Sequence, residues 1–240
     1  MCSVIISFLP GENWPVVIGA NRDEMIDRAW DAPARHWADR PGIIAGRDRL
    51  AGGTWLGLND RGVVAALLNR TGSLGPAAGK ASRGELPLIA LDEPTAKASA
   101  ARIAGLDSGL YRSFNMVIAD ADGGFLIRSL GHGHPDIAPL KPGIAMVTDH
   151  DPNDPASPRI ARYRRQFETA IRPDPANGDW TAWAALLADR TPPAETALNV
   201  GPRANGFGTV CSSLIALAPG DRRFLFAPGP PGRAGFSAVF

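Results

Sequence analysis

The residue with the most unusual chemical setting is Cys2, which directly follows Met1. A small second residue normally allows removal of the initiator methionine, so we expect Cys2 to become the amino-terminal residue. A thiol and an α-amino group would then share one residue, and such an amine, with a pKa of roughly 7.7–8.0, is partly neutral at physiological pH. A neutral amine accepts the thiol proton directly or through one water. The pair therefore indicates nucleophilic catalysis, and the alternative is that Cys2 is a small apolar residue before a strand.

A hairpin at the start of the chain would bring charged partners to Cys2. The apolar run at 2–9 predicts a strand, turn residues follow it, and the run at 15–20 predicts the returning strand. The position of the turn pairs residues whose numbers add to about 24, so Cys2 lies opposite about Arg22, roughly 4.5–5.5 Å away at Cβ. We expect Arg22 to stabilise a thiolate and Asp23 to orient the amine. The alternative for these charged residues is a solvated strand end.

A second hairpin is predicted over residues 51–69. Its turn position pairs Asn69 with about Gly52. The glycines at 52 and 53 would let backbone N–H groups approach a ligand closely. Asn69 ends an apolar run, where its side-chain amide could stabilise an oxyanion, and a turn asparagine is the plain alternative.

The remaining pattern is one of strand hairpins followed by helices, which favours an α+β fold with antiparallel sheets covered by helices. Residues 28–40 are expected to form a loop with aromatic contacts, residues 70–82 a flexible loop, and the Gly/Pro-rich tail 228–240 a partly disordered end. Further strands are predicted at 43–46, 113–119, 124–129, 144–148, 209–217 and 223–226, and helices at 86–91, 95–104, 158–171 and 180–188. For the helix at 95–104, Thr95 is the candidate cap and Gly105 the stop signal.

Composition excludes several functional classes. The 240 residues carry 25 basic and 24 acidic side chains, a net charge of +1, so the chain lacks the basic footprint of a nucleic-acid-binding or anionic-membrane-binding protein. No apolar run reaches the ~18 residues of a membrane span, and no secretory signal is recognisable. We therefore expect a cytoplasmic protein with a single domain over 1–240. In such a reducing compartment a disulfide between Cys2 and Cys211 is disfavoured.

Histidines are concentrated in two short segments, His132-Gly133-His134 and Asp149-His150-Asp151. A His-x-His pair can bind zinc, but neither segment has further ligands at a defined spacing. We therefore expect no metal and no cofactor.

Three segments taken in order resemble the NRDE family: Met1-Cys2, the tetrapeptide Asn21-Arg22-Asp23-Glu24, and Ala-Gly-Gly-Thr-Trp-Leu-Gly at 51–57. This family includes the eukaryotic transport-and-Golgi-organisation-two proteins. It is similar to the Cys-dependent N-terminal-nucleophile hydrolases, especially the penicillin V acylase and bile-salt hydrolase group. The resemblance spans the chain and implies an αββα four-layer sandwich with two antiparallel sheets.

The same resemblance implies roles for individual residues. Cys2 matches the nucleophile, Asp23 the residue that holds the free amine, and Asn69 the oxyanion-hole asparagine, with Arg22 beside them. The candidate catalytic residues are Cys2, Asp23, Arg22 and Asn69, and the candidate substrate-binding residues are Asn21, Gly52, Gly53 and Asp149.

Two positions depart from the family pattern. Thr148-Asp149 stands where related hydrolases have a Ser/Thr-Asn pair, and a carboxylate cannot donate a hydrogen bond to an oxyanion as an amide does. Val210 stands where many family members have an arginine, and Arg203 is a candidate to replace it in space.

Two functions fit these observations. The first is a hydrolase that acts on the C–N amide or thioester bond of a small acylated molecule. The second is a non-catalytic carrier of haem or acyl-coenzyme A that uses the same cleft, with Trp30, His36 and Trp37 lining it. In both cases the expected partner is a small molecule, without nucleic acid and without membrane insertion, and the oligomeric state stays open.

Overall fold

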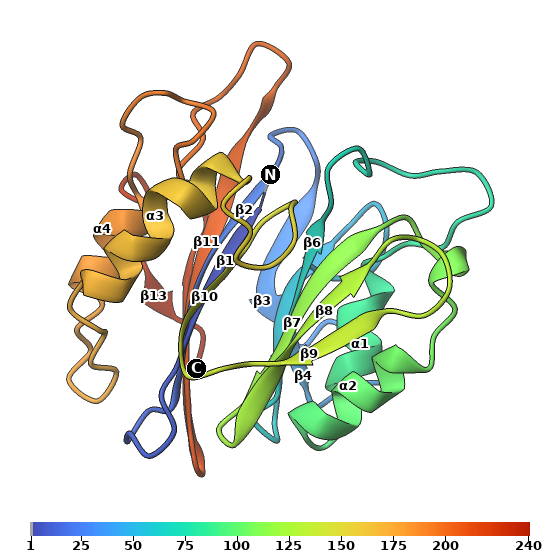
Figure 1. The fold of residues 1–240 in the computed structure, drawn as a ribbon, viewed down its shortest axis with the longest axis horizontal. Helices are drawn as coiled ribbons and strands as arrows, with labels where there is room; N and C mark the ends of the chain where they lie inside the picture. Colours follow the sequence, from blue (N-terminus) through green and yellow to red (C-terminus); the bar gives the residue numbers. More distant parts are fainter. Residues whose placement is uncertain (1) are drawn as a thin grey trace. The chain divides into compact units, whose positions relative to one another are not determined.

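The computed structural model describes residues 2–240. The chain forms two compact units. The first unit combines the residues up to Arg28 with Lys141–Phe240, and the second unit is Ala29–Leu140. Each unit is built on one antiparallel sheet with helices (Figure 1).

The sheet of the first unit has six strands within the described residues, in the order β10-β1-β2-β11-β12-β13. The hairpin predicted at the start of the chain therefore lies in the interior of this sheet, between β10 and β11. The strands are β1 (Ser3–Phe8), β2 (Val16–Met25), β10 (Gly143–Val147), β11 (Phe207–Ala218), β12 (Asp221–Ala227) and β13 (Ser237–Ala238).

Two helices cover one face of this sheet, α3 (Pro158–Thr169) and α4 (Thr181–Leu187), and Figure 1 shows them side by side. Their apolar faces pack on alternate residues of the strands because successive side chains of a strand point to opposite faces. The resulting core joins Ile5, Val17, Met146, Leu214 and Ala216 of the sheet to Ile160, Tyr163, Phe167, Trp183 and Leu187 of the helices.

The second unit has a seven-stranded sheet in the order β3-β4-β5-β6-β7-β8-β9 within the described residues. Helices α1 (Glu85–Leu91) and α2 (Ala96–Ala104) and the 3₁₀ helix η1 (Ser108–Leu110) complete it, and α1 and α2 share its apolar core. The strands are β3 (Trp30–Ala34), β4 (Ile43–Asp48), β5 (Leu56–Asn59), β6 (Val64–Asn69), β7 (Phe114–Asp120), β8 (Gly123–Ser129) and β9 (Asp136–Pro139).

Most predicted elements are present, and helix signals are confirmed in detail. Thr95 caps α2, since its side chain accepts the backbone N–H of Ala98 at 3.1 Å, and Gly105 ends the helix. Helix α3 ends at Thr169, two residues earlier than predicted, which leaves Ile171 exposed instead of packed.

One prediction about a loop is wrong. The segment 28–40 contains β3, which the proline at position 33 and the polar composition concealed, and β3 pairs with β4. The segment 70–82 has no helix or strand, as predicted, and arginine side chains contact it: Arg112 donates to the carbonyl oxygens of Gly72 and Leu74, and Arg83 donates to Ser73. The tail contributes β13, which pairs with β12.

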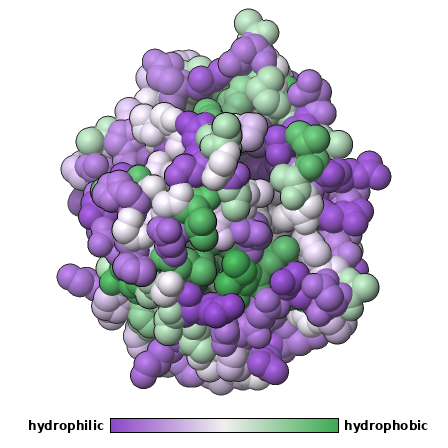
Figure 2. All heavy atoms as spheres, turned by 90° about the vertical axis from the view of Figure 1, so that its right-hand side faces the viewer, coloured by the Kyte–Doolittle hydropathy of each residue, from purple (hydrophilic) through white to green (hydrophobic). Residues whose placement is uncertain are grey.

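The surface in Figure 2 is mixed, with hydrophilic side chains surrounding small apolar groups. None of the helices in residues 2–240 combines the length and the apolar character needed to cross a bilayer.

Candidate active site in the first unit

The register of the first hairpin confirms the predicted pairing. Ser3 lies opposite Asn21 and Phe8 opposite Val16, so paired residue numbers add to 24 along the whole β1–β2 ladder. Continuing this register by one residue aligns Cys2 with Arg22. Cys2 therefore lies against the NRDE tetrapeptide, beside two interior strands of the sheet.

Strand alternation assigns the polar side chains of this hairpin to two faces. Ile5 and Val17 belong to the core beneath the helices, so Ser3, Asn21 and Asp23 point to the same helix-covered face. Arg22, one residue before Asp23, points to the opposite face. Cys2 shares that opposite face in the continued register.

The sulfur of Cys2 lies beside the backbone of Asp23. Its Sγ is 3.6 Å from the carbonyl oxygen of Asp23, and the residue is partly exposed. Burial raises the pKa of the Cys2 thiol, the negative charge of Asp23 raises it further, and the nearby charge of Arg22 lowers it. The lowering of the thiol pKa expected from Arg22 is present, but the opposite effect of burial is larger. The thiol is therefore protonated at neutral pH and needs a base to become a nucleophile.

The carboxylate of Asp23 is held by two donors. Arg159 Nη1 donates to Oδ2 at 2.9 Å, and Thr209 Oγ1 donates to Oδ1 at 2.6 Å. The side chains of Asp23 and Arg159 are 0% and 4% exposed, so this is a fully buried ion pair. Arg159 Nη1 also donates to Ser3 Oγ at 3.1 Å, which ties the residue after Cys2 into the same group.

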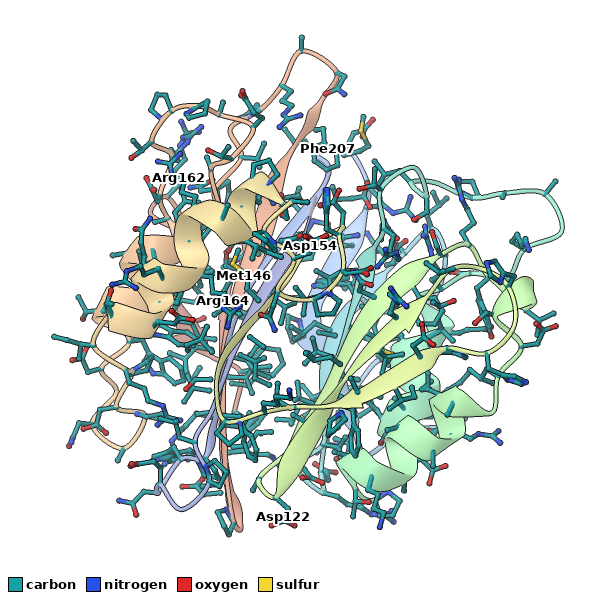
Figure 3. All side chains as sticks on the ribbon, in the orientation of Figure 1. Asp122, Met146, Asp154, Arg162, Arg164 and Phe207 are labelled. Atoms are coloured by element: carbon teal, nitrogen blue, oxygen red, sulfur yellow. The ribbon has the colours of Figure 1, made fainter. Side chains whose placement is uncertain are left out.

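Two irregular features bring these donors to Asp23. Arg159 is the second residue of α3, directly after Pro158. The helix therefore begins beside the end of β2, where Asp23 lies. In β11 the pairing with β2 shifts between Thr209 and Cys211, which leaves Val210 as the extra residue of a bulge. The shift sets Thr209 opposite Asp23 and Cys211 opposite Arg22. Figure 3 shows the region, with Arg162 and Arg164 marking α3 and Phe207 marking the first residue of β11.

Arg22 lies between the two cysteines of the chain. Its side chain is buried, and Nη2 is 3.9 Å from the carboxylate of Glu24. Since Cys2 aligns with one side of Arg22 and Cys211 pairs with the other, the two thiols are two strands apart, or roughly 10 Å. A disulfide requires Cα atoms within about 7 Å, and both cysteines are indeed free.

The side chain of Asn21 makes hydrogen bonds to three other parts of the first unit. Its Nδ2 donates to the carbonyl oxygens of Leu187 at 2.9 Å and Leu198 at 3.0 Å, and its Oδ1 accepts from Ser212. Both amide hydrogens are therefore engaged within the protein, and Asn21 is removed from the candidate substrate contacts.

Asp149 follows β10, the other neighbour of β1. Val4 pairs with Val147, so the register continued by two residues aligns Asp149 with Cys2. The Asp149 side chain is buried, and its Oδ1 is 3.3 Å from His150 Nδ1. Thr148, the preceding residue, shares a 2.9 Å hydrogen bond with Ser157. Cys2 is thus aligned with Arg22 on one side and with Asp149 on the other.

The other candidate residues belong to the second unit. Asn69 ends β6 as predicted and pairs with Phe114 of β7 on one side. On the other side the β5–β6 ladder begins at Leu56, so the expected pairing of Asn69 with Gly52 does not form. The glycines form a turn in which the Gly52 N–H donates to Asp48 O at 2.8 Å. The close backbone approach expected here occurs at Gly53, and its partner is Gly84 of the protein itself.

The aromatic and histidine residues weighed as a ligand pocket are engaged in local contacts. Trp37 packs on the core of the second unit and donates to Gly52 O, His36 Nε2 lies 2.8 Å from Ala32 O, and Trp30 meets Trp55 edge-to-face at 6.0 Å. Within residues 2–240 no cluster of three His, Cys, Asp or Glu side chains is arranged to hold a metal ion.

Arg159, Thr209 and Ser3 are the site residues that the sequence analysis missed. Arg159 opens a helix that was assigned correctly, yet its contact with Asp23 spans 136 residues of chain, and no local pattern encodes it. One signal was available: an arginine directly after the proline that starts a helix places a cation in the first turn, where the helix dipole disfavours one. Arg203, the proposed replacement for the arginine absent at Val210, is exposed in the loop before β11.

Comparison with solved structures identifies the class of fold. A Caenorhabditis elegans N-acylethanolamine-hydrolyzing acid amidase ortholog is 14% identical with a TM-score of 0.59, over 89% of this chain and 92% of that one. A variant of conjugated bile acid hydrolase from Clostridium perfringens is 11% identical with a TM-score of 0.58, over 99% and 92%. Penicillin V acylase from Agrobacterium tumefaciens is 14% identical with a TM-score of 0.54, over 95% and 83%. The fold is that of the N-terminal-nucleophile hydrolases, an α+β architecture with two antiparallel sheets, as expected.

Within that class, sequence comparison gives the family. The family model for Transport and Golgi organisation 2 matches residues 1–219, so the chain belongs to this family. The Transport and Golgi organization protein 2 homolog of Homo sapiens is 32% identical over 155 residues, and the Mus musculus homolog is 30% identical over the same length. Both matches cover 60% of this chain and 55% of the relative, so the chain matches about half the length of these curated relatives.

Proposed function

We propose that this protein is a Cys-dependent N-terminal-nucleophile hydrolase that cleaves the C–N amide or thioester bond of a small acylated molecule. The observation that carries the proposal is the position of Cys2 Sγ, partly exposed and 3.6 Å from Asp23 O, at the start of a central strand. The fold likeness to an acid amidase, a bile acid hydrolase and a penicillin acylase supports the same reaction class.

The reaction begins when removal of Met1 frees the α-amino group of Cys2. The amine takes the thiol proton, and the sulfur attacks the carbonyl carbon, so that a C–S bond forms while the carbonyl π electrons move to oxygen. When the C–N or C–S bond of the substrate breaks, the ammonium gives its proton to the departing nitrogen or sulfur. Water then attacks the acyl-enzyme, the amine takes a proton from that water, and release of the carboxylic acid restores the thiol.

The neighbouring residues have distinct parts in this proposal. Asp23 orients the α-ammonium. Arg22 makes the thiolate less costly, which matters because burial raises the thiol pKa. Asp149 has only acceptor oxygens when ionised, so it suits a substrate that presents a donor such as an N–H or O–H group.

The test compares two preparations of the full chain. One is made as a fusion that a protease cleaves directly before Cys2, and the other is the same fusion left uncleaved. Incubated with a p-nitrophenyl ester or an acyl thioester, the cleaved protein should gain the mass of one acyl group on Cys2 and then lose it by hydrolysis. The uncleaved protein and the cleaved Cys2→Ala variant should gain none.

Turnover by the uncleaved fusion would refute the role of the amine. A carrier function replaces the hydrolase if the cleaved protein forms no acyl-enzyme with either probe but binds a ligand. The sign of binding is a shift of the haem Soret band on titration, or retention of acyl-coenzyme A by the protein.

A further inference from the structure

The ion pair between Arg159 and Asp23 has no explanation in the stability of helix α3 itself. Arg159 is in the first turn, where the helix dipole disfavours a positive charge. Its side chain is also only 4% exposed, and burying a guanidinium costs several kcal/mol unless it is paired and hydrogen-bonded. The contacts with Asp23 and Ser3 account for the position of this arginine.

Those contacts link the residue after the candidate nucleophile to the acidic residue beside it. One nitrogen, Nη1, donates to Asp23 Oδ2 at 2.9 Å and to Ser3 Oγ at 3.1 Å. Thr209 completes the arrangement from β11 by donating to Asp23 Oδ1 at 2.6 Å. The carboxylate is thus held in one orientation by α3 and β11, which are far from Asp23 in the sequence, and its charge is balanced.

We propose that Arg159 is a positioning residue for the nucleophile: it balances the charge of Asp23 and fixes the start of β1, and thereby keeps the Cys2 thiol reactive near neutral pH. The inference rests on the proposed role of Cys2, but its consequence is visible in thiol chemistry without any turnover.

The electrostatics around Cys2 give the direction of the effect. The charged and titratable groups around it are the terminal amine, Arg22 and Asp23 from β2, Cys211 across Arg22 on β11, and Asp149 with His150 after β10. Among these the charge of Asp23 raises the pKa of the thiol and that of Arg22 lowers it. Without Arg159 the negative charge of Asp23 acts on the thiol uncompensated. A smaller fraction of Cys2 is then thiolate at a given pH.

The experiment measures the rate of iodoacetamide alkylation at Cys2 against pH in the full chain, by mass spectrometry of the Cys2 peptide so that Cys211 is read separately. In Arg159→Met the midpoint of the profile should move upward by about one pH unit or more, which corresponds to roughly tenfold slower alkylation near pH 7. Arg159→Lys, which keeps the charge, should restore most of the rate. Arg162→Met is the matched control, because Arg162 is on the same helix but contacts Thr191 and Thr196 instead of Asp23.

A second pair of variants isolates the mechanism. Asp23→Asn removes the charge that Arg159 balances, so its midpoint should lie below that of the parent. Adding Arg159→Met to it removes the opposite charge as well and should return the midpoint towards the parent value. This arm also serves if Arg159→Met alone does not fold. An unchanged profile in Arg159→Met, or a midpoint in Asp23→Asn that does not fall below that of the parent, would overturn the inference. A protein that shows the predicted profiles but forms no acyl-enzyme would refute the proposed hydrolase and leave the positioning role intact.

Discussion

The carboxylate of Asp23 shows how firmly the fold fixes a single side chain. Both of its oxygens accept a hydrogen bond, from Arg159 and from Thr209, and none of its surface is exposed. The thiol of Cys2 contacts the backbone of the same residue. One position of the NRDE tetrapeptide thus contributes its side chain to one face of the sheet and its carbonyl oxygen to the contact with the Cys2 thiol.

A second buried titratable residue, Tyr163 of α3, makes the folded state sensitive to high pH. Its hydroxyl donates to Asp189 Oδ2 at 2.6 Å, and burial, followed by this hydrogen bond, raises the pKa of Tyr163 from 10 to about 12. The folded state therefore favours the neutral phenol, so this contribution to stability is complete below pH 10 and is lost as the pH rises towards about 12.

We predict that the Tyr163→Phe variant loses less stability than the parent between these pH values, although it is less stable at neutral pH by about 1–3 kcal/mol because Asp189 loses a donor. Urea unfolding at a series of pH values measures both effects. Tyr111, the other tyrosine of the chain, remains in this variant, and because burial raises its pKa as well, its contribution is common to the parent and the variant. Parallel stability curves for the parent and the variant would contradict the assigned pKa.

At the scale of elements, the site depends on where elements begin and on one bulge. The start of α3 and the extra residue of β11 at Val210 both act on the end of β2. In the second unit, the glycine turn before β5 has a comparable structural use. Gly53 lies so close to the first residues of α1 that an added Cβ would be 2.3 Å from the carbonyl carbon of Gly84.

The two adjacent glycines of that turn should respond differently to substitution. Gly53→Ala should destabilise the protein by about 1–3 kcal/mol through overpacking against backbone. Gly52 has a φ of +75° with open space around its Cβ position, so Gly52→Ala should cost about 1 kcal/mol for conformation alone. Asparagine tolerates a left-handed conformation, so Gly52→Asn should recover stability whereas Gly53→Asn should not. Thermal unfolding of the four variants tests this, and recovery by asparagine at both positions would contradict it.

At the scale of the whole molecule, the first unit is assembled from the two ends of the described chain. Strands β1 and β2 come from the first 28 residues and lie between β10 and β11, which come from the last hundred. The Asp23–Arg159 ion pair likewise joins a residue of the first 28 to a residue of the last hundred. This sheet therefore cannot form from either part of the chain alone.

Dividing the chain at the end of the second unit tests this assembly. The fragment 141–240 by itself should show no cooperative unfolding transition, because it lacks the two middle strands of its sheet. Mixing it with the fragment 1–140 should restore a cooperative transition, and Arg159→Met in the smaller fragment should weaken the complex. Cooperative unfolding of 141–240 alone, with its native tryptophan fluorescence, would show that β1 and β2 are dispensable.

Local patterns alone determined much of this protein. The alternation of apolar residues and the turn chemistry near Gly11 were sufficient for the register of the first hairpin, and so for the position of Cys2 against Arg22. Thr95, which caps α2, and Gly105, which follows the last helical residue, defined the two ends of this helix. These features depend on neighbours a few residues apart, whose preferences act in any fold.

Only the tertiary structure decided what surrounds those residues. Three contacts illustrate this: Asp23 pairs with Arg159, Asn21 donates to Leu187 and Leu198, and Gly53 packs on Gly84. The residues in these contacts are 31 to 177 positions apart in the sequence. Such contacts arise because burial forces each polar group to find a partner wherever the packed elements bring one, and the partner's own sequence surroundings carry no mark of it.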